Sequence, residues 1–293
     1  MIVNATTMQG CNRAFSTIFK DALLQAMAKS LWEKVAMRTT GVGASTEYNW
    51  LGAMPTMREW VGDRAVKDLS AFGFIIRNKD FESTVEVDRN SIEDDQIGTY
   101  TPNFQQLGFA AAEHRDRLVF ALLAAGFTTL CYDGQYFFDT DHPVGEGVVS
   151  NHGGGAGAPW FLMDLSRPVK PIILQIRKEP QFVAMDSQTD ENVFRRKKFQ
   201  YGVDDRKNVG FGLWQLAFGS KQTLDPAGYE AARNGLGGMK NDEGQPMGLR
   251  GTHLIVGQSH ESAGRALLLN ERLANGATNT WFNSAELVVV PWL

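Results

Sequence analysis

The chain has 293 residues, 43% hydrophobic and 21% charged, so it can bury a sizeable core and is not a disordered chain. Its net charge of −4, from 29 basic and 33 acidic residues, excludes the strongly basic surface that tight, sequence-independent nucleic-acid binding needs. Its 2 cysteines are far apart, which favours a reducing compartment. No apolar run approaches the roughly 20 residues of a membrane span, so we expect a protein made in a cytoplasm, with no membrane partner.

The N-terminal part is expected to hold a polar start and one amphipathic helix. Residues 1–12 are polar and predict a mobile end. From Phe15 to Leu31, apolar residues recur at near-helical spacing. Two partners for this apolar stripe remain open, namely the chain's own core and a neighbouring molecule.

Residues 48–64, YNWLGAMPTMREWVGDR, combine large aromatic side chains with fixed charges and contain no catalytic or metal-ligand pattern. The residues that give the segment this character are Trp50, Arg58, Trp60, Asp63 and Arg64. Aromatics beside charges are typical of an interface that fits one partner. We therefore expect the two tryptophans to anchor a contact between subunits and the three charged residues to set its register.

Two alternating runs predict a β-hairpin before the longest helix. Apolar residues share one parity over 72–76 and alternate with polar ones over 81–88, where Glu82 and Glu86 face away from them. A short polar turn at 78–80 joins the two runs. Because an isolated hairpin is marginal in water, we expect this one to lie on a neighbouring subunit.

Residues 102–125 predict one long helix. Thr101 offers a capping hydroxyl, Pro102 suits the first helical position, and Gly126 supplies the stop. Apolar residues recur at steps of three and four, and the helix would be roughly 36 Å long. His114 lies on this apolar stripe and is expected to be a packed side chain, not a base.

The second half of the chain predicts shorter elements. Residues 132–160 are expected to form a long loop, and residues 186–198 a charged segment between strands. Strands are expected at 172–176, 182–185, 209–218, 253–256 and 286–290. Asp225 and Ser259 are expected to cap two helices on either side of a polar loop at 240–251. These last elements predict a small α/β subdomain.

Two patterns resemble sites of chemistry, and a structural role is favoured for both. His152 begins an HGGG sequence like an esterase oxyanion loop, but no G-x-S-x-G accompanies it, so a flexible glycine loop is favoured. Asp139, Asp141 and His142 could bind a divalent metal, yet a polar turn ended by Pro143 is favoured. We therefore expect no enzyme, no cofactor and no metal.

A basic run at residues 195–198 could contact phosphates. The negative net charge favours two other roles for it. One is a solvated face, and the other is pairing with a neighbour's carboxylates, such as those of Glu82, Glu86 and Asp88.

Three segments of the chain resemble the major head subunit of phage Mu and Mu-like prophages. They are YNWLGAMPTMREWVGDR, DGQYFFDTDHP and FQYGVDDRKNVGFGLWQLAFGSK, at 48–64, 133–143 and 199–221. The resemblance implies the α+β capsid fold of the Hong Kong 97 type. Its parts would be an N-terminal arm (1–45), an extended β-hairpin loop (46–98), a peripheral domain (99–224 and 281–293) with a long spine helix (102–125), and an axial domain (225–280). The last strand would return to the peripheral sheet.

The resemblance implies a major capsid protein of the virion, assembled in a bacterial host's cytoplasm. It would self-assemble as hexamers and pentamers into an icosahedral head around packaged double-stranded DNA. Implied partners are a scaffold protein, a portal and decoration proteins, and the modest negative charge predicts only weak, non-specific contact with the DNA. Gly237, Gly238 and Lys240 would meet their equivalents around the five- and six-fold axes. The alternatives are a nanocompartment shell of the same fold, or a hydrolase using the glycine-rich loop and the Asp/His cluster.

Overall fold

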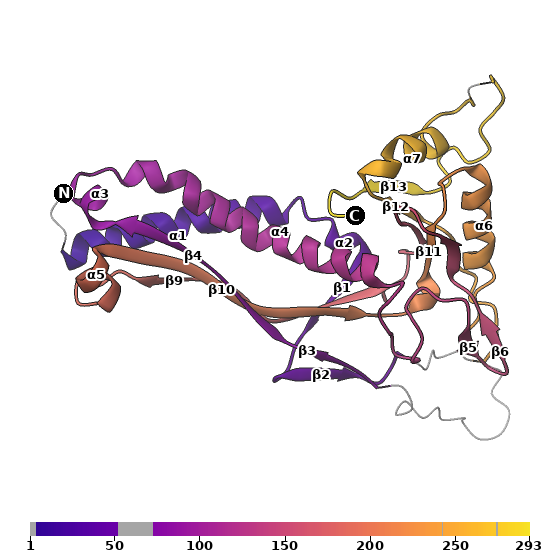
Figure 1. Cartoon of the computed structure of the whole chain (residues 1–293), viewed down its shortest axis with the longest axis horizontal. Helices are drawn as coiled ribbons and strands as arrows, with labels where there is room; N and C mark the ends of the chain where they lie inside the picture. Colours follow the sequence, from indigo (N-terminus) through magenta and orange to yellow (C-terminus); the bar gives the residue numbers. More distant parts are fainter. Residues whose placement is uncertain (1–3, 52–72, 242, 274) are drawn as a thin grey trace.

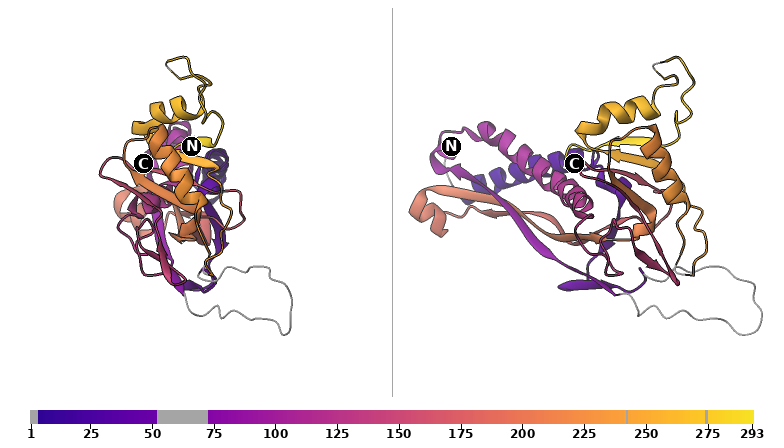
Figure 2. Two further views of the ribbon diagram at one scale, coloured as in Figure 1. Left: turned by 90° about the vertical axis from the view of Figure 1, so that its right-hand side faces the viewer. Right: turned by 45° about the vertical axis from the view of Figure 1, so that its right-hand side comes forward.

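The computed structural model describes residues 4–51, 73–241, 243–273 and 275–293. Two sheets follow one another along the long axis of an elongated α+β molecule (Figure 1). A four-stranded sheet with two long helices on one face forms one half. A five-stranded sheet flanked by two shorter helices forms the other half, and the right-hand view of Figure 2 also keeps these halves apart. None of the described helices is long and apolar enough to cross a lipid bilayer.

The four-stranded sheet has the order β1-β9-β10-β4. Its strands are β1 (Ala36–Thr40), β9 (Ile172–Met185), β10 (Lys198–Phe211) and β4 (Lys79–Asp88). β1 runs parallel to β9, and the other two pairs are antiparallel. β9 joins into one strand the two short strands predicted at 172–176 and 182–185. Helices α1 (Ala5–Met27) and α4 (Thr101–Ala125) cover one face of this sheet.

Helix α1 packs along α4 and buries its apolar stripe within the chain. The ring of Phe15 stacks on that of Phe104 at 4.0 Å between centroids, and Tyr201 of β10 meets both rings edge-on. Of the two partners left open for this stripe, the structure therefore shows the chain's own core. The expectation of a mobile start is wrong from residue 4 onward, because Asn4 caps α1 and Met8 is buried.

Helix α4 confirms the predicted long helix, with the predicted stop at Gly126. The predicted capping hydroxyl is wrong, because Thr101 is already helical and Tyr100 occupies the N-cap position. The reason lies in the preceding 3-10 turn, η1 (Ile97–Tyr100), which runs directly into the helix and accepts the Thr101 N–H on Gly98. A cap from a side chain is therefore unnecessary at this end.

The predicted hairpin between the runs at 72–76 and 81–88 is wrong. β3 (Phe74–Arg77) pairs with β2 (Ser45–Tyr48), whereas β4 pairs with β10. Asn78 connects the two-stranded sheet of β2 and β3 to the four-stranded sheet. Its side-chain amide donates to Gly43 O and accepts a hydrogen bond from Gln175. A hairpin does exist, but its strands are β2 and β3.

The five-stranded sheet has the order β13-β12-β8-β11-β7. Its strands are β13 (Glu286–Val289), β12 (His253–Val256), β8 (Trp160–Met163), β11 (Ala217–Lys221) and β7 (His152–Gly155), flanked by α6 (Pro226–Gly237) and α7 (Glu261–Leu268). The last strand pairs in parallel with β12, at the edge of the sheet that also holds β8, β11 and β7. The expected cap at Ser259 is also wrong, because His260 precedes α7.

The expected long loop at 132–160 contains ordered strands. β5 (His142–Val144) and β6 (Gly147–Val149) form a small antiparallel pair, and β7 follows as an edge strand of the five-stranded sheet. HGGG is therefore a strand and not the flexible loop that was favoured. Glycine and single polar residues in such short strands remove the alternation that reveals longer ones.

The remaining short elements complete the chain. They are α2 (Trp32–Val35), α3 (Arg89–Glu93), α5 (Glu191–Arg196) and the 3-10 turns η2 (Trp214–Leu216) and η3 (Gln258–His260). One apolar core extends from the end of the four-stranded sheet that faces the five-stranded sheet into the five-stranded sheet itself. A second core lies between α1, α4 and the far end of the four-stranded sheet.

Candidate assembly surfaces

Trp50 lies two residues after the end of β2 and is half-buried on the chain's own core. Its ring meets that of Tyr48 edge-on at 6.3 Å, and the Tyr48 hydroxyl donates to Gln175 Oε1 at 2.9 Å. Arg58, Trp60, Asp63 and Arg64 lie outside the described residues. The anchoring and register roles of the whole set therefore stay predictions.

The β2–β3 hairpin is seated on the four-stranded sheet by several contacts, among them the close packing of β3 on β10. A Cβ atom at Gly210 of β10 would lie 2.3 Å from Ile76 Cδ1, so the glycine makes room for β3. Ile76 is buried there, while the neighbouring Ile75 is 54% exposed on the other side of the strand. The hairpin thus has one face held by its own chain and one apolar side chain left for another surface.

Glu82 and Glu86 lie on β4, the edge strand of the four-stranded sheet. Glu86 accepts hydrogen bonds from Lys198 Nζ at 2.6 Å and Gln200 Nε2 at 3.0 Å, both on β10 of the same chain, and they lower its pKa. Lys198 was expected to pair with a carboxylate of a neighbouring subunit, but in the structure it pairs with Glu86 of its own chain. Glu82 is exposed and accepts from Thr84 Oγ1 at 2.9 Å. A contact of either glutamate with another subunit stays a prediction.

The end of α6 carries the three residues predicted to meet their equivalents around symmetry axes. As predicted, Asp225 caps this helix, with Oδ1 accepting the Gly228 N–H at 2.7 Å. Gly237 and Gly238 are exposed at the other end, and Lys240 is exposed in a bridge with Pro246. The structure thus brings these three residues together at one surface.

The loop after α6 belongs to a turn that occurs three times in the chain. The turns cover 130–136, 240–246 and 272–278, each closed by an antiparallel bridge between its end residues. In each, the fifth residue is a glycine with positive φ, namely Gly134, Gly244 or Gly276. Glycine adopts such values with least strain, so the three turns share the same glycine position.

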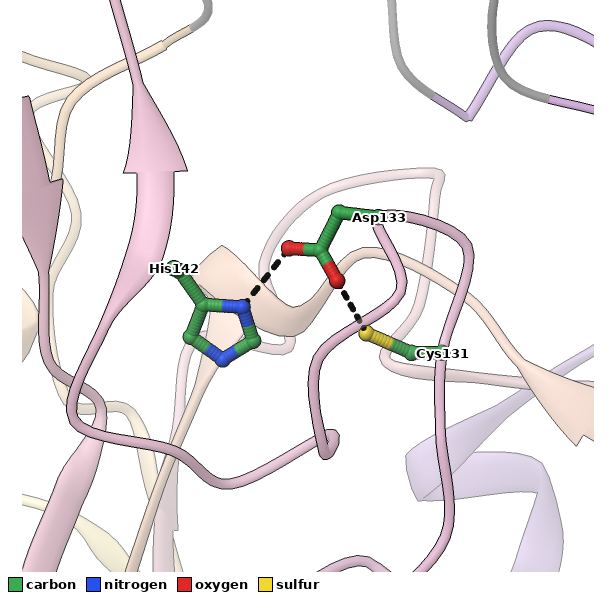
Figure 3. A group of neighbouring side chains, drawn as sticks. All are labelled: Cys131, Asp133 and His142. Atoms are coloured by element: carbon green, nitrogen blue, oxygen red, sulfur yellow. Dashed lines mark hydrogen bonds and ion pairs between the residues drawn. The ribbon is translucent and has the colours of Figure 1, made fainter. Parts of the chain in front are cut away.

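A buried polar network lies where the two sheets meet, around the turn at 130–136. Figure 3 shows its centre, where Asp133 lies between His142 and Cys131. His142 Nδ1 is 2.7 Å from Asp133 Oδ2, and Cys131 Sγ donates to Asp133 Oδ1 at 3.0 Å. Burial opposes ionisation of Asp133, but the hydrogen bonds from His142 and Cys131 outweigh it and lower its pKa. Burial and the nearby Asp133 carboxylate raise the pKa of the Cys131 thiol, which therefore stays protonated.

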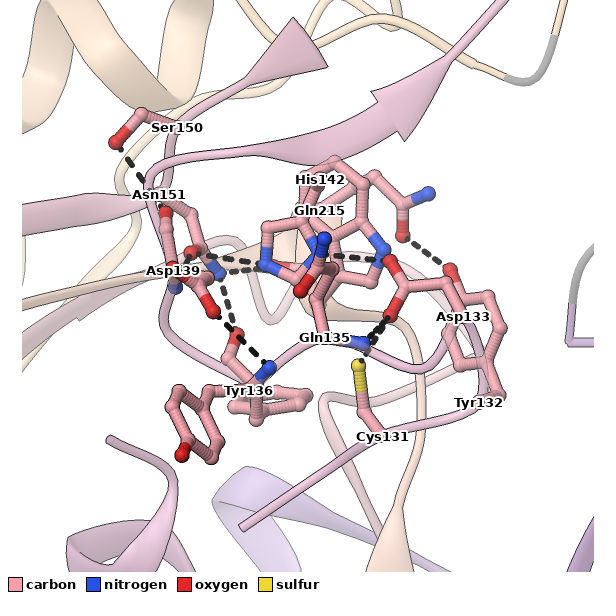
Figure 4. Close-up of polar contacts among 12 residues, drawn as sticks. Cys131, Tyr132, Asp133, Gln135, Tyr136, Asp139, His142, Ser150, Asn151 and Gln215 are labelled. Carbon is pink, nitrogen blue, oxygen red and sulfur yellow. Dashed lines mark hydrogen bonds and ion pairs between the residues drawn. The ribbon is translucent and has the colours of Figure 1, made fainter. Parts of the chain in front are cut away.

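The network continues to Asn151, as Figure 4 shows. The Asn151 amide donates to Phe137 O at 2.8 Å and Ala217 O at 3.2 Å, and its Oδ1 lies 3.2 Å from His142 Nε2. The His142 ring stacks on Trp214 at 3.8 Å between centroids. These bonds tie the turn and β5 to the five-stranded sheet, so the network is a structural junction.

The three residues weighed as metal ligands do not converge. His142 takes part in the junction, whereas Asp139 accepts the Tyr136 and Thr140 backbone N–H groups and Asp141 is exposed. Cys131 and Asp133, which do approach His142, were not recognised from the sequence, because their spacing matches no ligand motif. Both oxygens of Asp133 already accept hydrogen bonds, so the geometry is that of a satisfied carboxylate.

Comparison with known proteins gives agreement over nearly the whole chain. The family model described as Mu-like prophage major head subunit gpT matches residues 8–293. The Mu-like prophage FluMu major head subunit of Haemophilus influenzae is 42% identical over 269 residues, which cover 88% of this chain and 87% of the relative. The major capsid protein of Escherichia phage Mu is 38% identical over 311 residues, covering 100% of both chains.

Solved head structures show the same fold. A chain from the procapsid of bacteriophage JBD30 matches with a TM-score of 0.88 and 42% identity, covering 99% of this chain and 100% of that one. A chain from the JBD30 capsid decorated with minor capsid protein trimers matches with a TM-score of 0.79 and 33% identity, covering 92% of both. Family model, relatives and fold agree, and they describe structural proteins of the phage head, not enzymes. The chain therefore belongs to the family of Mu-like prophage major head subunits and is the major capsid protein of a Mu-like phage.

Proposed function

We propose that this chain self-assembles, as pentamers and hexamers, into the icosahedral head of a Mu-like tailed phage and encloses its packaged double-stranded DNA. The observation that carries the proposal is the match to the JBD30 procapsid chain over almost the full length of both proteins. Such a match includes the parts of the chain that would be surface in a solitary molecule. A nanocompartment shell shares the fold class only.

The two halves of the molecule support a division into domains. The four-stranded sheet with α1 and α4 corresponds to the peripheral domain, and α4 to its spine helix. The five-stranded sheet with α6 and α7 corresponds to the axial domain. This division places β7, β8, β11 and β13 in the axial domain, which is larger than residues 225–280.

Contacts between subunits are assigned to two surfaces. One is the surface of the β2–β3 hairpin, where Ile75 is exposed and Trp50 is partly buried. The other is the turn after α6, where Gly237, Gly238 and Lys240 face outward. The exposed glycines at the end of α6 would let this surface bend differently around the five- and six-fold axes.

The partners proposed for this head are a scaffold protein, a portal and a decoration protein. The JBD30 capsid is decorated with minor capsid protein trimers, which supports a trimeric partner here as well. The net charge of −4 supports only weak contact with packaged DNA.

Particles from an induced lysate would test the function directly. We expect closed shells by electron microscopy, with this chain as their main protein and nuclease-resistant DNA inside. Shells that hold an enzyme cargo and no genome would instead support the nanocompartment. A wild-type chain that remains monomeric during sedimentation, even when produced with its scaffold, would contradict self-assembly.

The turn after α6 offers a more local test. Lys240→Trp should reduce the yield of capsomers, because a bulky side chain repeated around a symmetry axis would hold the subunits apart. Lys20→Trp, at an exposed position of α1, is a control with the same substitution. Equal capsomer yields from both variants would contradict the role of this turn.

A further inference from the structure

The third of the bridged turns, at 272–278 between α7 and β13, carries an Asn-Gly pair at the surface. Asn275 and Gly276 are both exposed, and the turn projects away from the five-stranded sheet (Figure 1). Because glycine has no Cβ, its backbone nitrogen can approach the side chain of the preceding residue more closely than that of any other residue can. An exposed asparagine before a glycine is therefore open to attack by that nitrogen on its side-chain carbonyl carbon.

A hydrogen bond of the turn prepares the Asn275 carbonyl for this attack. The Ala277 backbone N–H donates to Asn275 Oδ1 at 3.0 Å. A donor at this place stabilises the negative charge that develops on the oxygen when a nucleophile adds to the carbon. The Gly276 N–H donates to Leu273 O at 2.9 Å, so one hydrogen bond of an exposed turn has to open before the nitrogen can react. Openings of this small kind are the least costly in a folded protein.

Comparable positions elsewhere in the chain lack this combination. In the other two bridged turns the residue before the glycine is Asp133 or Glu243. The Asp133 carboxylate is held by hydrogen bonds and, being ionised, is a poor electrophile. Glu243 would have to close a larger ring. The second Asn-Gly pair of the sequence, Asn234–Gly235, lies inside α6, where the helical backbone holds the glycine nitrogen away from the side chain.

We propose that Asn275 is a site of spontaneous deamidation, with water as the only co-reactant. The Gly276 nitrogen bonds to Asn275 Cγ while the Cγ–Nδ2 bond breaks, and the proton from the nitrogen leaves with the side-chain amide as ammonia. Water then opens the five-membered imide at either carbonyl, which gives aspartate or isoaspartate. Either product adds one negative charge to a chain whose net charge is −4. Isoaspartate also lengthens the backbone by one methylene, which would disturb the bridge between Arg272 and Thr278.

Ageing of the purified full-length protein tests the site. After incubation at mildly alkaline pH, peptide mass spectrometry should show deamidation at least about tenfold faster at position 275 than at position 234, because α6 has to unfold locally before the second site can react. Cleavage after Arg233 and after Arg272 places the two sites on different peptides. The chain in denaturant is the reference, since both Asn-Gly pairs should react there at similar rates. Equal rates in the folded protein, or an unmodified position 275, would overturn the proposal.

Two variants test the parts of the reaction. Asn275→Gln should lack the first acidic form that accumulates with age on isoelectric focusing, because glutamine would have to close a larger ring. Ala277→Pro removes the N–H that bonds to Asn275 Oδ1, so it should slow deamidation about tenfold in the folded protein, as for loss of one hydrogen bond, and leave the rate in denaturant unchanged. An acidic form that persists in Asn275→Gln would overturn the site, and equal slowing in both states would overturn the role of the turn. The reaction needs no other subunit, so these outcomes are independent of the proposed assembly.

Discussion

The Asp116 carboxylate of α4 caps helix α2, because its Oδ1 accepts the backbone N–H of Trp32 at 2.7 Å and that of Leu31 at 2.9 Å. α2 has no side-chain cap of its own. Asp116 is 3% exposed, and burial raises its pKa although the two backbone hydrogen bonds act in the opposite direction. Helix α2 is thus fastened to α4 by a buried acceptor, and burial disfavours the ionised form of that acceptor.

Asp116→Ala should lower the free energy of unfolding by about 1–3 kcal/mol, because two buried N–H groups lose their acceptor. Asp116→Asn should cost much less, since the amide oxygen can accept the same bonds without a buried charge. Chemical denaturation followed by tryptophan fluorescence measures both, in a subunit kept unassembled. If Asn proves as costly as Ala, the charge itself stabilises the contact and the acceptor argument is wrong.

Gly108 allows α1 and α4 to pack against each other. A Cβ there would lie 2.6 Å from Phe19 O and 2.8 Å from Leu23 N, and backbone atoms of a packed helix have little room to move. Gly108→Ala should therefore destabilise the subunit, although alanine is the better helix former by about 1 kcal/mol. Gly10→Ala on α1 is the matched control, because nothing lies within 4 Å of its added Cβ, and it should stabilise.

If this packing holds, chemical denaturation should show that Gly108→Ala lowers the free energy of unfolding and that Gly10→Ala raises it. Stabilisation by both would show that α1 can shift along α4, and that the close approach is not needed for the fold.

His114 is a packed side chain, as its place on the apolar stripe predicts. Its ring meets that of Phe81 edge-on at 4.4 Å, and burial, followed by the nearby Lys207, lowers its pKa below 6.5. A histidine with a lowered folded-state pKa contributes stability that is complete above the unfolded pKa and is lost as pH falls from there through the folded pKa. The subunit should therefore lose stability between about pH 7 and 5, and His114→Gln should lose less over that interval. Thermal unfolding at several pH values measures this loss of stability. An equal loss in the wild type and in His114→Gln would contradict the contribution of His114.

The sequence predicted α4 and α6 well because their ends are marked locally. Pro102 and Gly126 mark α4, and Asp225 marks the start of α6. Strand partners were not marked in this way. Alternation identifies β3 and β4 as strands, but β4 pairs with β10, more than a hundred residues later, and Gly210 of β10 is what accommodates Ile76 of β3. Pairing at such separation depends on tertiary packing, which a period of two does not describe.

The candidate surfaces were predicted in part, for similar reasons. The exposed residues after α6 follow from a glycine-rich helix end, which is a local signal. Cys131, Asp133 and His142 were missed as a group because only the fold brings together a turn and a strand at irregular spacing.

The junction around Asp133 should make the subunit sensitive to acid. Its pKa lies below the usual 3.8, so the ionised form is favoured in the folded state. A carboxyl group with a lowered folded-state pKa contributes stability above its unfolded pKa, near 3.9, and that stability is lost as pH falls through the folded value. Asp133→Asn should lower the free energy of unfolding at pH 7 by about 1–3 kcal/mol, because buried donors lose their charged acceptor.

The same variant should lose less stability than the wild type between about pH 5 and 3, because the titrating group is absent. Asp141→Asn is the matched control, since Asp141 is exposed, and it should follow the wild-type curve. Denaturation measured at several pH values distinguishes the two variants. If Asp133→Asn and wild type fall in parallel on acidification, other carboxylates such as Glu286, whose pKa is lowered by its hydrogen bond with Lys34, carry the acid sensitivity instead.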